Sequence, residues 1–159
     1  MQVPFQPSCN WKFAGRPGIA WEAASSPYEH SIVQENMPES PAKPKVLIAD
    51  DEQVIANTLA MILNQSGFDA RPVYSGEKAL ELAVTFQPDM LISDVIMSDL
   101  NGIETAIRIR ALLPKVKILL FSGQAATADL LEKARSQGYE FEILAKPVHP
   151  QDLLNRLRS

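Results

Sequence analysis

Five polar residues each stand where a run of apolar residues in the sequence ends: Asp50, Asp51, Asp94, Ser122 and Lys146. Three carboxylates gathered at one place form an oxygen-rich ligand set that suits a hard cation such as Mg²⁺. An ammonium group and a hydroxyl beside them can stabilise the negative charge of a phosphoryl group in transfer. These residue types predict phosphoryl transfer to a carboxylate. Asp94 is the predicted nucleophile, because it ends the middle strand and an open loop follows it.

A parallel sheet is the structure that can bring these positions together. From Lys45 onward, short apolar runs alternate with segments whose apolar residues recur at helical spacing. This alternation predicts an α/β fold, in which helices cover both faces of the sheet and the crossovers are right-handed. Ligands gather at the carboxyl ends of the strands in such sheets. The predicted strands are 46–49, 68–74, 90–93, 116–121 and 141–145; a first helix ends before Gly67, and the others are 76–86, 103–113, 127–137 and 150–158.

One proline indicates where the second strand lies. Pro72 falls inside the apolar segment 68–74. Proline has no backbone N–H and cannot donate a hydrogen bond to a neighbouring strand, so it is confined to the edges of sheets. The second strand is therefore predicted to be an edge strand.

Residues 1–44 differ in character from the rest of the chain. They hold seven of the twelve prolines, both tryptophans and the single cysteine, and no helical or alternating pattern persists there. We expect a disordered N-terminal tail, followed by a folded domain at 45–159. A short partner-binding element formed by Trp11, Phe13, Ile19 and Trp21 is a less favoured alternative. Translation starting at Met37 is another.

Composition excludes several classes of protein. The net charge is −4 and no long run of lysine or arginine occurs, so we expect no direct contact with nucleic acid. Cys9 is the only cysteine, which excludes an intramolecular disulfide or a cysteine zinc cluster. No apolar run is long enough to span a bilayer or to form a signal peptide. The sequence predicts a cytoplasmic protein without membrane contact.

Four short motifs together resemble the response-regulator receiver family. They are the acidic pair in LIADDE, the loop ISDVIMSDLNG, the hydroxyl step FSG and the lysine in AKP. The resemblance covers residues 45–159. It implies a flavodoxin-like α/β fold, namely a doubly wound, five-stranded parallel sheet of order 2-1-3-4-5 with five helices.

The same resemblance implies a Mg²⁺ site built from four residues. Asp51 and Asp94 would be direct ligands through their carboxylates. The backbone carbonyl of Ile96 would be a third ligand, and Asp50 would act mostly through metal-bound water.

The resemblance also implies a role in signalling. Asp94 would accept a phosphoryl group from the phosphohistidine of a histidine kinase or histidine phosphotransfer protein. Ser122 would donate a hydrogen bond to the phosphoryl group, and Lys146 would pair with it. Such a protein is not an enzyme but a phosphoacceptor signalling protein that assists its own phosphoryl transfer and hydrolysis. Because the chain ends about a dozen residues after Lys146, we expect a stand-alone receiver that signals through contact with a downstream protein target.

Three positions depart from the family pattern. Ser98 stands where proline commonly follows the methionine of the acceptor loop, which predicts a less rigid turn. Ile143 stands where an aromatic residue usually turns inward on activation, which predicts a smaller conformational switch. Val95 stands where some members have an aromatic residue next to the phosphoacceptor.

Other functions on similar folds fit the sequence less well. Aspartyl-phosphate hydrolases of the haloacid dehalogenase type need Asp-x-Asp after the first strand, whereas Asp50 and Asp51 are adjacent. A flavin-binding flavodoxin needs a hydroxyl-rich and glycine-rich loop there, which DDEQV is not. A degenerate receiver that only binds partners is disfavoured by the intact acidic set.

Overall fold

A computed structural model describes residues 40–123 and 127–159 of the chain. The predicted partner-binding element around Trp11 and the start-site alternative at Met37 lie outside these ranges. Within them, five strands alternate with five helices. In chain order these are β1 (Lys45–Ala49), α1 (Gln53–Gln65), β2 (Asp69–Val73), α2 (Gly76–Phe86), β3 (Met90–Asp94), α3 (Gly102–Leu112), β4 (Lys117–Ser122), α4 (Ala128–Ser136), β5 (Glu142–Ala145) and α5 (Pro150–Arg158).

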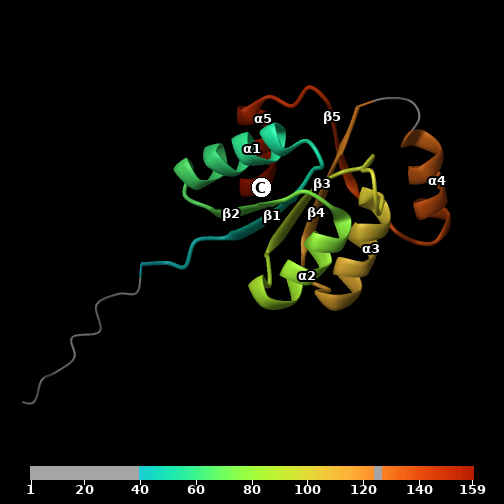
Figure 1. Ribbon diagram of the computed structural model, residues 1–159, viewed down its shortest axis with the longest axis horizontal. Helices are drawn as coiled ribbons and strands as arrows, with labels where there is room; N and C mark the ends of the chain where they lie inside the picture. The colour runs from blue at the N-terminus through green and yellow to red at the C-terminus, as the bar shows by residue number, and fades with distance from the viewer. Residues whose placement is uncertain (1–39, 124–126) are drawn as a thin grey trace, which may run out of the picture. The chain divides into compact units, whose positions relative to one another are not determined.

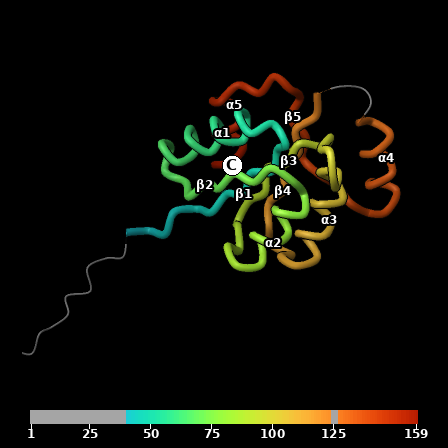
Figure 2. The backbone as a smooth tube through the Cα atoms, in the orientation of Figure 1, coloured from blue at the N-terminus to red at the C-terminus, as the bar shows by residue number. Residues whose placement is uncertain are grey.

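The five strands form one parallel sheet of order β2-β1-β3-β4-β5, which confirms the predicted fold class and strand order. Figure 1 shows α1 and α5 on one side of the sheet and α2 and α3 on the other. The tube in Figure 2 shows how the chain passes from β1 outward to β2 and then returns across β1 to β3. None of the described helices is long and apolar enough to cross a membrane.

Each face of the sheet has its own apolar core. Val46 and Ile48 pack with the residues of α1 and α5, whereas Leu47 and Ala49 pack with those of α2 and α3. Successive side chains of a strand point to opposite faces, so a strand covered on both sides is apolar at every position. This explains why the β1 sequence reads as a continuous apolar run.

Strand β2 lies at the edge of the sheet, as Pro72 predicted. The outward backbone groups of Ala70 are bonded to Asn64 of α1: the side-chain Nδ2 donates to the Ala70 carbonyl at 3.0 Å, and Oδ1 accepts from the Ala70 N–H at 2.9 Å. Alternate residues of a strand direct their backbone groups to the same side. Pro72, two residues further on, therefore has its missing N–H on that same outward side.

The observed bounds differ from the predicted ones by one residue at several ends, which is within the usual uncertainty of helix and strand limits. Helix α3 begins one residue earlier than predicted, at Gly102, because Asn101 caps it: its Oδ1 accepts from the Glu104 N–H at 2.8 Å. Helix α4 is shorter than the predicted 127–137 and runs from Ala128 to Ser136. These shifts leave the predicted side chains of the site at the ends of their strands, while Ile96 lies in the loop after β3.

Helix α3 begins in close contact with the carboxyl end of β3. A Cβ atom added to Gly102 would lie 1.8 Å from the Asp94 carbonyl oxygen and 2.8 Å from the Ser93 Oγ. Both atoms belong to a strand at the centre of the sheet and cannot move aside cheaply. Only glycine allows this approach, which places the first turn of α3 directly behind Asp94.

Replacing Gly102 with alanine is expected to lower the free energy of unfolding by at least about 2 kcal/mol, because the methyl group forces the helix away from β3. Gly123→Ala is a suitable control, since among the residues that the structure describes its added Cβ would meet only the Lys146 Cδ, at 4.0 Å. Urea denaturation of both variants tests this expectation. Equal midpoints for the two would contradict it.

Candidate functional site

The predicted site residues meet at the carboxyl edge of the sheet. Asp50 and Asp51 follow β1, Asp94 ends β3, Ser122 ends β4 and Lys146 follows β5. One carboxylate oxygen from each of the three aspartates lies within 4.8 Å of the others. The fold thus brings together side chains from four strands, with the acidic group at the centre.

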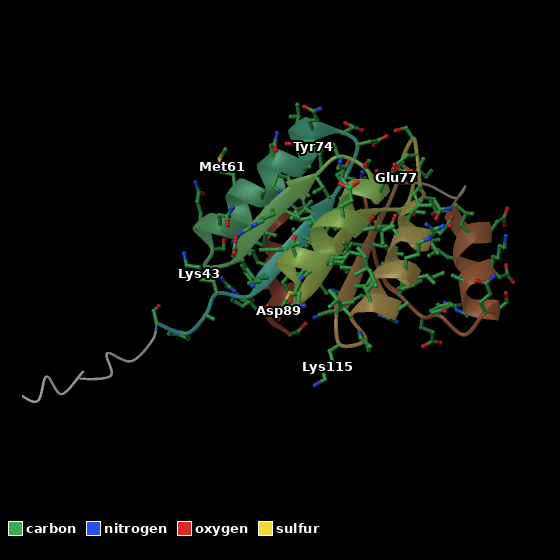
Figure 3. The ribbon with its side chains drawn as sticks, turned by 60° about the horizontal axis from the view of Figure 1, so that its bottom comes forward. Lys43, Met61, Tyr74, Glu77, Asp89 and Lys115 are labelled. Carbon is green, nitrogen blue, oxygen red and sulfur yellow. The ribbon has the colours of Figure 1, made fainter. Side chains whose placement is uncertain are left out.

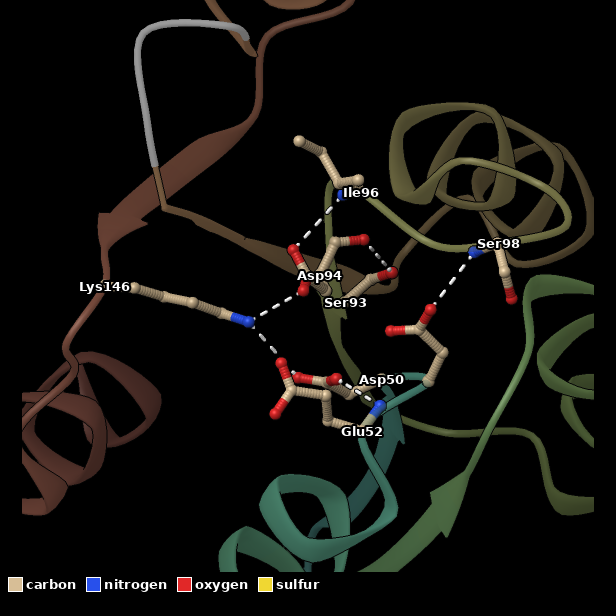
Figure 4. Close-up of polar contacts among 8 residues, drawn as sticks. Asp50, Glu52, Ser93, Asp94, Ile96, Ser98 and Lys146 are labelled. Atoms are coloured by element: carbon tan, nitrogen blue, oxygen red, sulfur yellow. Dashed lines mark hydrogen bonds and ion pairs between the residues drawn. The ribbon is translucent and has the colours of Figure 1, made fainter.

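Lys146 reaches across this group. Its Nζ donates to Asp94 Oδ2 at 2.7 Å and to Asp50 Oδ2 at 3.4 Å, as the dashed lines in Figure 4 show. Burial by itself lowers the pKa of Lys146, but the hydrogen bond and charge of Asp94 and the charge of Asp50 outweigh it and raise the pKa. The lysine is therefore a charged ammonium throughout the neutral range.

Asp50 is the buried member of the acidic group, with 1% of its surface exposed. Its Oδ1 accepts from the Glu52 N–H at 2.9 Å. Burial raises the pKa of Asp50, and the charge of Asp94 adds to that effect, while the Glu52 N–H and Lys146 act in the opposite direction. The net increase means that a negative charge at this position has a cost in the absence of a cation.

Asp94 and Asp51 are more accessible. Asp94 Oδ1 accepts from the Ile96 N–H at 3.2 Å, so its two oxygens are held by different donors. Asp51 is exposed, and its Oδ2 accepts from the Ser98 N–H at 3.2 Å. The backbone N–H of Ile96 thus has a contact in the site, whereas the ligand role of its carbonyl stays a prediction.

Ser122 has a partner that the sequence did not predict. Its hydroxyl forms a hydrogen bond with the hydroxyl of Thr127, the buried residue just before α4. Sequence reasoning had assigned Thr127 only to the start of a helix. A threonine at such a position ordinarily indicates a cap, and no pattern in the sequence connects it to Ser122.

The three departures from the family pattern occupy different environments. Val95 is fully buried, and Ile143 lies on β5 with 38% of its surface exposed. Ser98 lies on the exposed loop between β3 and α3, where it contacts Asp51. The structure therefore places Ser98, but not Ile143, in direct contact with the acidic group.

The donor set fits a hard divalent cation. All three side chains offer carboxylate oxygen, the atom type that Mg²⁺ prefers, and they are close enough for one ion to contact all of them. Burial is the main cause of the raised pKa of Asp50, and the charge of Asp94 adds to it, so the ionised form is disfavoured despite Lys146. A bound cation would supply the remaining positive charge.

Comparison with known proteins agrees with this geometry. Residues 46–158 match the family model described as the response regulator receiver domain. The chain belongs to the response regulator receiver family. Receiver domains of this family are phosphoacceptor modules of two-component signalling systems, and they interact with histidine kinases and downstream targets.

Curated relatives contain the receiver as part of longer proteins. The alkaline phosphatase synthesis transcriptional regulatory protein PhoP of Bacillus subtilis is 31% identical over 118 residues, which cover 72% of this chain and 47% of PhoP. The autoinducer 1 sensor kinase/phosphatase LuxN of Vibrio campbellii is 31% identical over 110 residues, which cover 69% of this chain and 13% of LuxN. The chain thus spans about half of PhoP and a small part of LuxN.

A solved structure of similar size also matches the receiver. The chemotaxis protein CheY4 of Vibrio cholerae has a TM-score of 0.66 and 27% identity, and the match covers 74% of this chain and 98% of CheY4. The match therefore extends over almost all of the solved CheY4 chain.

The raised pKa of Asp50 predicts how stability depends on pH. A carboxyl group whose pKa is higher in the folded state destabilises the fold where it is ionised, and the cost is relieved as pH falls through the raised pKa. In EDTA at pH 7, Asp50→Asn is expected to stabilise the receiver by about 1 kcal/mol, or roughly 4 °C in Tm. The gain should shrink towards pH 4.

Calorimetry at both pH values tests this expectation. Asp129→Asn, an exposed change at the start of α4, is the control and should change stability by less than about 0.5 kcal/mol. A lower Tm for Asp50→Asn at pH 7 would show instead that the ionised Asp50 stabilises the fold through its contact with Lys146.

Proposed function

We propose that this receiver accepts a phosphoryl group on Asp94, in a Mg²⁺-dependent reaction, from the phosphohistidine of a histidine kinase or histidine phosphotransfer protein. The observation that carries the proposal is the cluster of three aspartate oxygens within 4.8 Å of one another, with the Lys146 ammonium 2.7 Å from Asp94. A nucleophilic carboxylate, a cation site and a fixed positive charge are the components that phosphoryl transfer to an aspartate requires.

The chemical step exchanges one bond to phosphorus for another. A carboxylate oxygen of Asp94 bonds to phosphorus as the nitrogen–phosphorus bond of the donor phosphohistidine breaks, and the electron pair stays on the imidazole nitrogen. The phosphoryl oxygens carry negative charge throughout. Lys146 pairs with one of these oxygens, since its Nζ is already hydrogen-bonded to Asp94.

Ser122 provides a second donor to the phosphoryl group. Its hydroxyl shares a hydrogen bond with the Thr127 hydroxyl before the reaction, so a movement of Ser122 towards the phosphoryl group changes that bond. Thr127 lies at the start of α4. The change at Ser122 is thereby linked to α4, and from there to the surface formed with β5 and α5.

The cation would be held by Asp51, Asp94 and the Ile96 carbonyl, with Asp50 acting through metal-bound water. When bound, Mg²⁺ supplies positive charge that offsets the charge of the aspartates and of the phosphoryl oxygens. The burial of Asp50 and the exposure of Asp51 support this division of roles. The residues of the chain then orient the phosphoryl group around that charge.

We also propose how the receiver acts in the cell. It is a stand-alone cytoplasmic protein with residues 1–44 as a tail, it signals through contact with a downstream protein, and it does not bind nucleic acid directly. The net charge of −4 supports the last point. The two relatives named above have roles that differ from each other: PhoP is a transcriptional regulatory protein, and LuxN is a sensor kinase/phosphatase. The mass of the native protein, with its size on gel filtration, tests the stand-alone arrangement.

A receiver that binds partners without being phosphorylated is the rival function. This rival function does not explain why Lys146 contacts Asp50, which is 96 positions away in the sequence, inside an acidic pocket. Breaking up the acidic group would stabilise such a protein, so the maintained charge supports the phosphoacceptor role.

Incubation with acetyl phosphate or phosphoramidate and Mg²⁺ is expected to add one phosphoryl group, measured by intact mass. Asp94→Asn should abolish the addition, because the amide is not a nucleophile. Asp89→Asn is the matched control at the other end of β3, and Figure 3 shows Asp89 at the end of the domain opposite to Tyr74 and Glu77. An unchanged mass increase in Asp94→Asn would refute the assignment.

Mg²⁺ is expected to stabilise the folded receiver, because the unfolded chain has no assembled site. At one hundred times its dissociation constant the gain is about 2.7 kcal/mol. Asp51→Asn should gain much less, because it removes a direct ligand. Thermal unfolding at matched ionic strength, with Na⁺ as the control for screening, measures both. Equal Tm values for the wild type with and without Mg²⁺ would exclude the metal site.

A further inference from the structure

Each of the three aspartates in the site accepts one backbone N–H. Asp50 accepts from Glu52, and Asp94 accepts from Ile96, in each case two positions further along the chain. The third contact is different in kind. The Ser98 N–H donates to Asp51 Oδ2 across 47 positions, from the loop after β3 to the segment after β1. Figure 4 shows this bond reaching the site from the side opposite to Lys146.

The loop that carries Ser98 is fixed on both sides. Before it, Met97 is buried in the core. After it, Asp99 accepts from the N–H groups of Gly76 at 3.3 Å and Glu77 at 3.2 Å, at the start of α2. The Ser98 amide is therefore held in place by neighbours that do not belong to the site.

The electrostatics of Asp99 agree with this anchoring. Its desolvation alone would raise its pKa, but the backbone N–H groups of Glu77, Gly76 and Leu100 lower it overall. A carboxylate stabilised in this way stays ionised and bonded to α2 at neutral pH. The loop is thus attached to α2 through Asp99 and to Asp51 through Ser98.

We propose that the backbone amide of Ser98 is a positioning group for the cation site, which orients Asp51 as a Mg²⁺ ligand. With Oδ2 bonded to the amide, the Asp51 carboxylate cannot rotate freely, and its orientation is fixed relative to Asp50 and Asp94. Hydrogen bonds to ligating carboxylates strengthen metal binding in this manner. This inference rests on the proposed function and adds a group that a proline at position 98 could not supply.

Two substitutions at one position isolate the amide. Ser98→Pro removes the N–H, whereas Ser98→Ala removes only the hydroxyl and keeps the N–H. Titration of the full-length chain with Mg²⁺ by calorimetry should give a Kd about three- to tenfold weaker for Ser98→Pro and within about twofold of wild type for Ser98→Ala. Equal Kd values for wild type and Ser98→Pro would overturn the inference.

Phosphorylation at two Mg²⁺ concentrations separates positioning from damage to the fold. With Ser98→Pro, the rate with acetyl phosphate should be reduced at limiting Mg²⁺ and should approach the wild-type rate at saturation. A deficit of equal size at both concentrations would count against a role through Asp51. Absence of Mg²⁺ binding by the wild type would instead refute the proposed function itself.

A second measurement leaves position 98 unchanged. In the ¹⁵N-labelled full chain, the Ser98 amide proton should resonate downfield in metal-free buffer and move upfield in Asp51→Ala, which lacks the acceptor. Asp89→Ala is the control, since it removes a carboxylate at the other end of β3. An unchanged Ser98 resonance in Asp51→Ala would show that the bond does not exist in solution.

Discussion

The structure depends on one electrostatic constraint, which is that three carboxylates must lie close together at the edge of a largely apolar sheet. Like charges a few ångströms apart repel, and the repulsion grows as water is excluded. The fold meets this constraint with Lys146, which comes from the far end of the sequence and contacts both Asp50 and Asp94. One ammonium cannot balance three negative charges, and the three carboxylates are close enough that they could hold a further cation. The order of the strands is what brings Lys146 within reach.

Much of this could be predicted from the sequence, because the information is local. The strand ends could be located because apolar runs end there in polar residues. The alternation of strands and helices indicates a parallel sheet, in which the carboxyl ends of the strands lie at one edge. Pro72 placed β2 correctly, since the lack of an N–H group is a property of the residue itself. The positions of Asp50, Asp51, Asp94, Ser122 and Lys146 follow from these two arguments.

Contacts between loops could not be predicted in the same way. The bonds of Ser98 to Asp51 and of Ser122 to Thr127 depend on where irregular segments pass each other. Serine and threonine in loops have many possible partners, so their identity says little. The departure at Ser98 is visible in the sequence, where the missing proline predicts only a less rigid turn. The structure shows that the loss of proline also provides a donor.

The contact between Asn64 and Ala70 protects one border of the sheet. On β2, the side-chain amide of Asn64 takes the place of a neighbouring strand for Ala70, and Pro72 offers no donor beside it. An unfolded or partly folded neighbour therefore finds few free backbone groups along β2, which opposes domain swapping and fibril growth from that side. A strand from a partner would therefore have to displace the Asn64 amide before it could extend the sheet at β2.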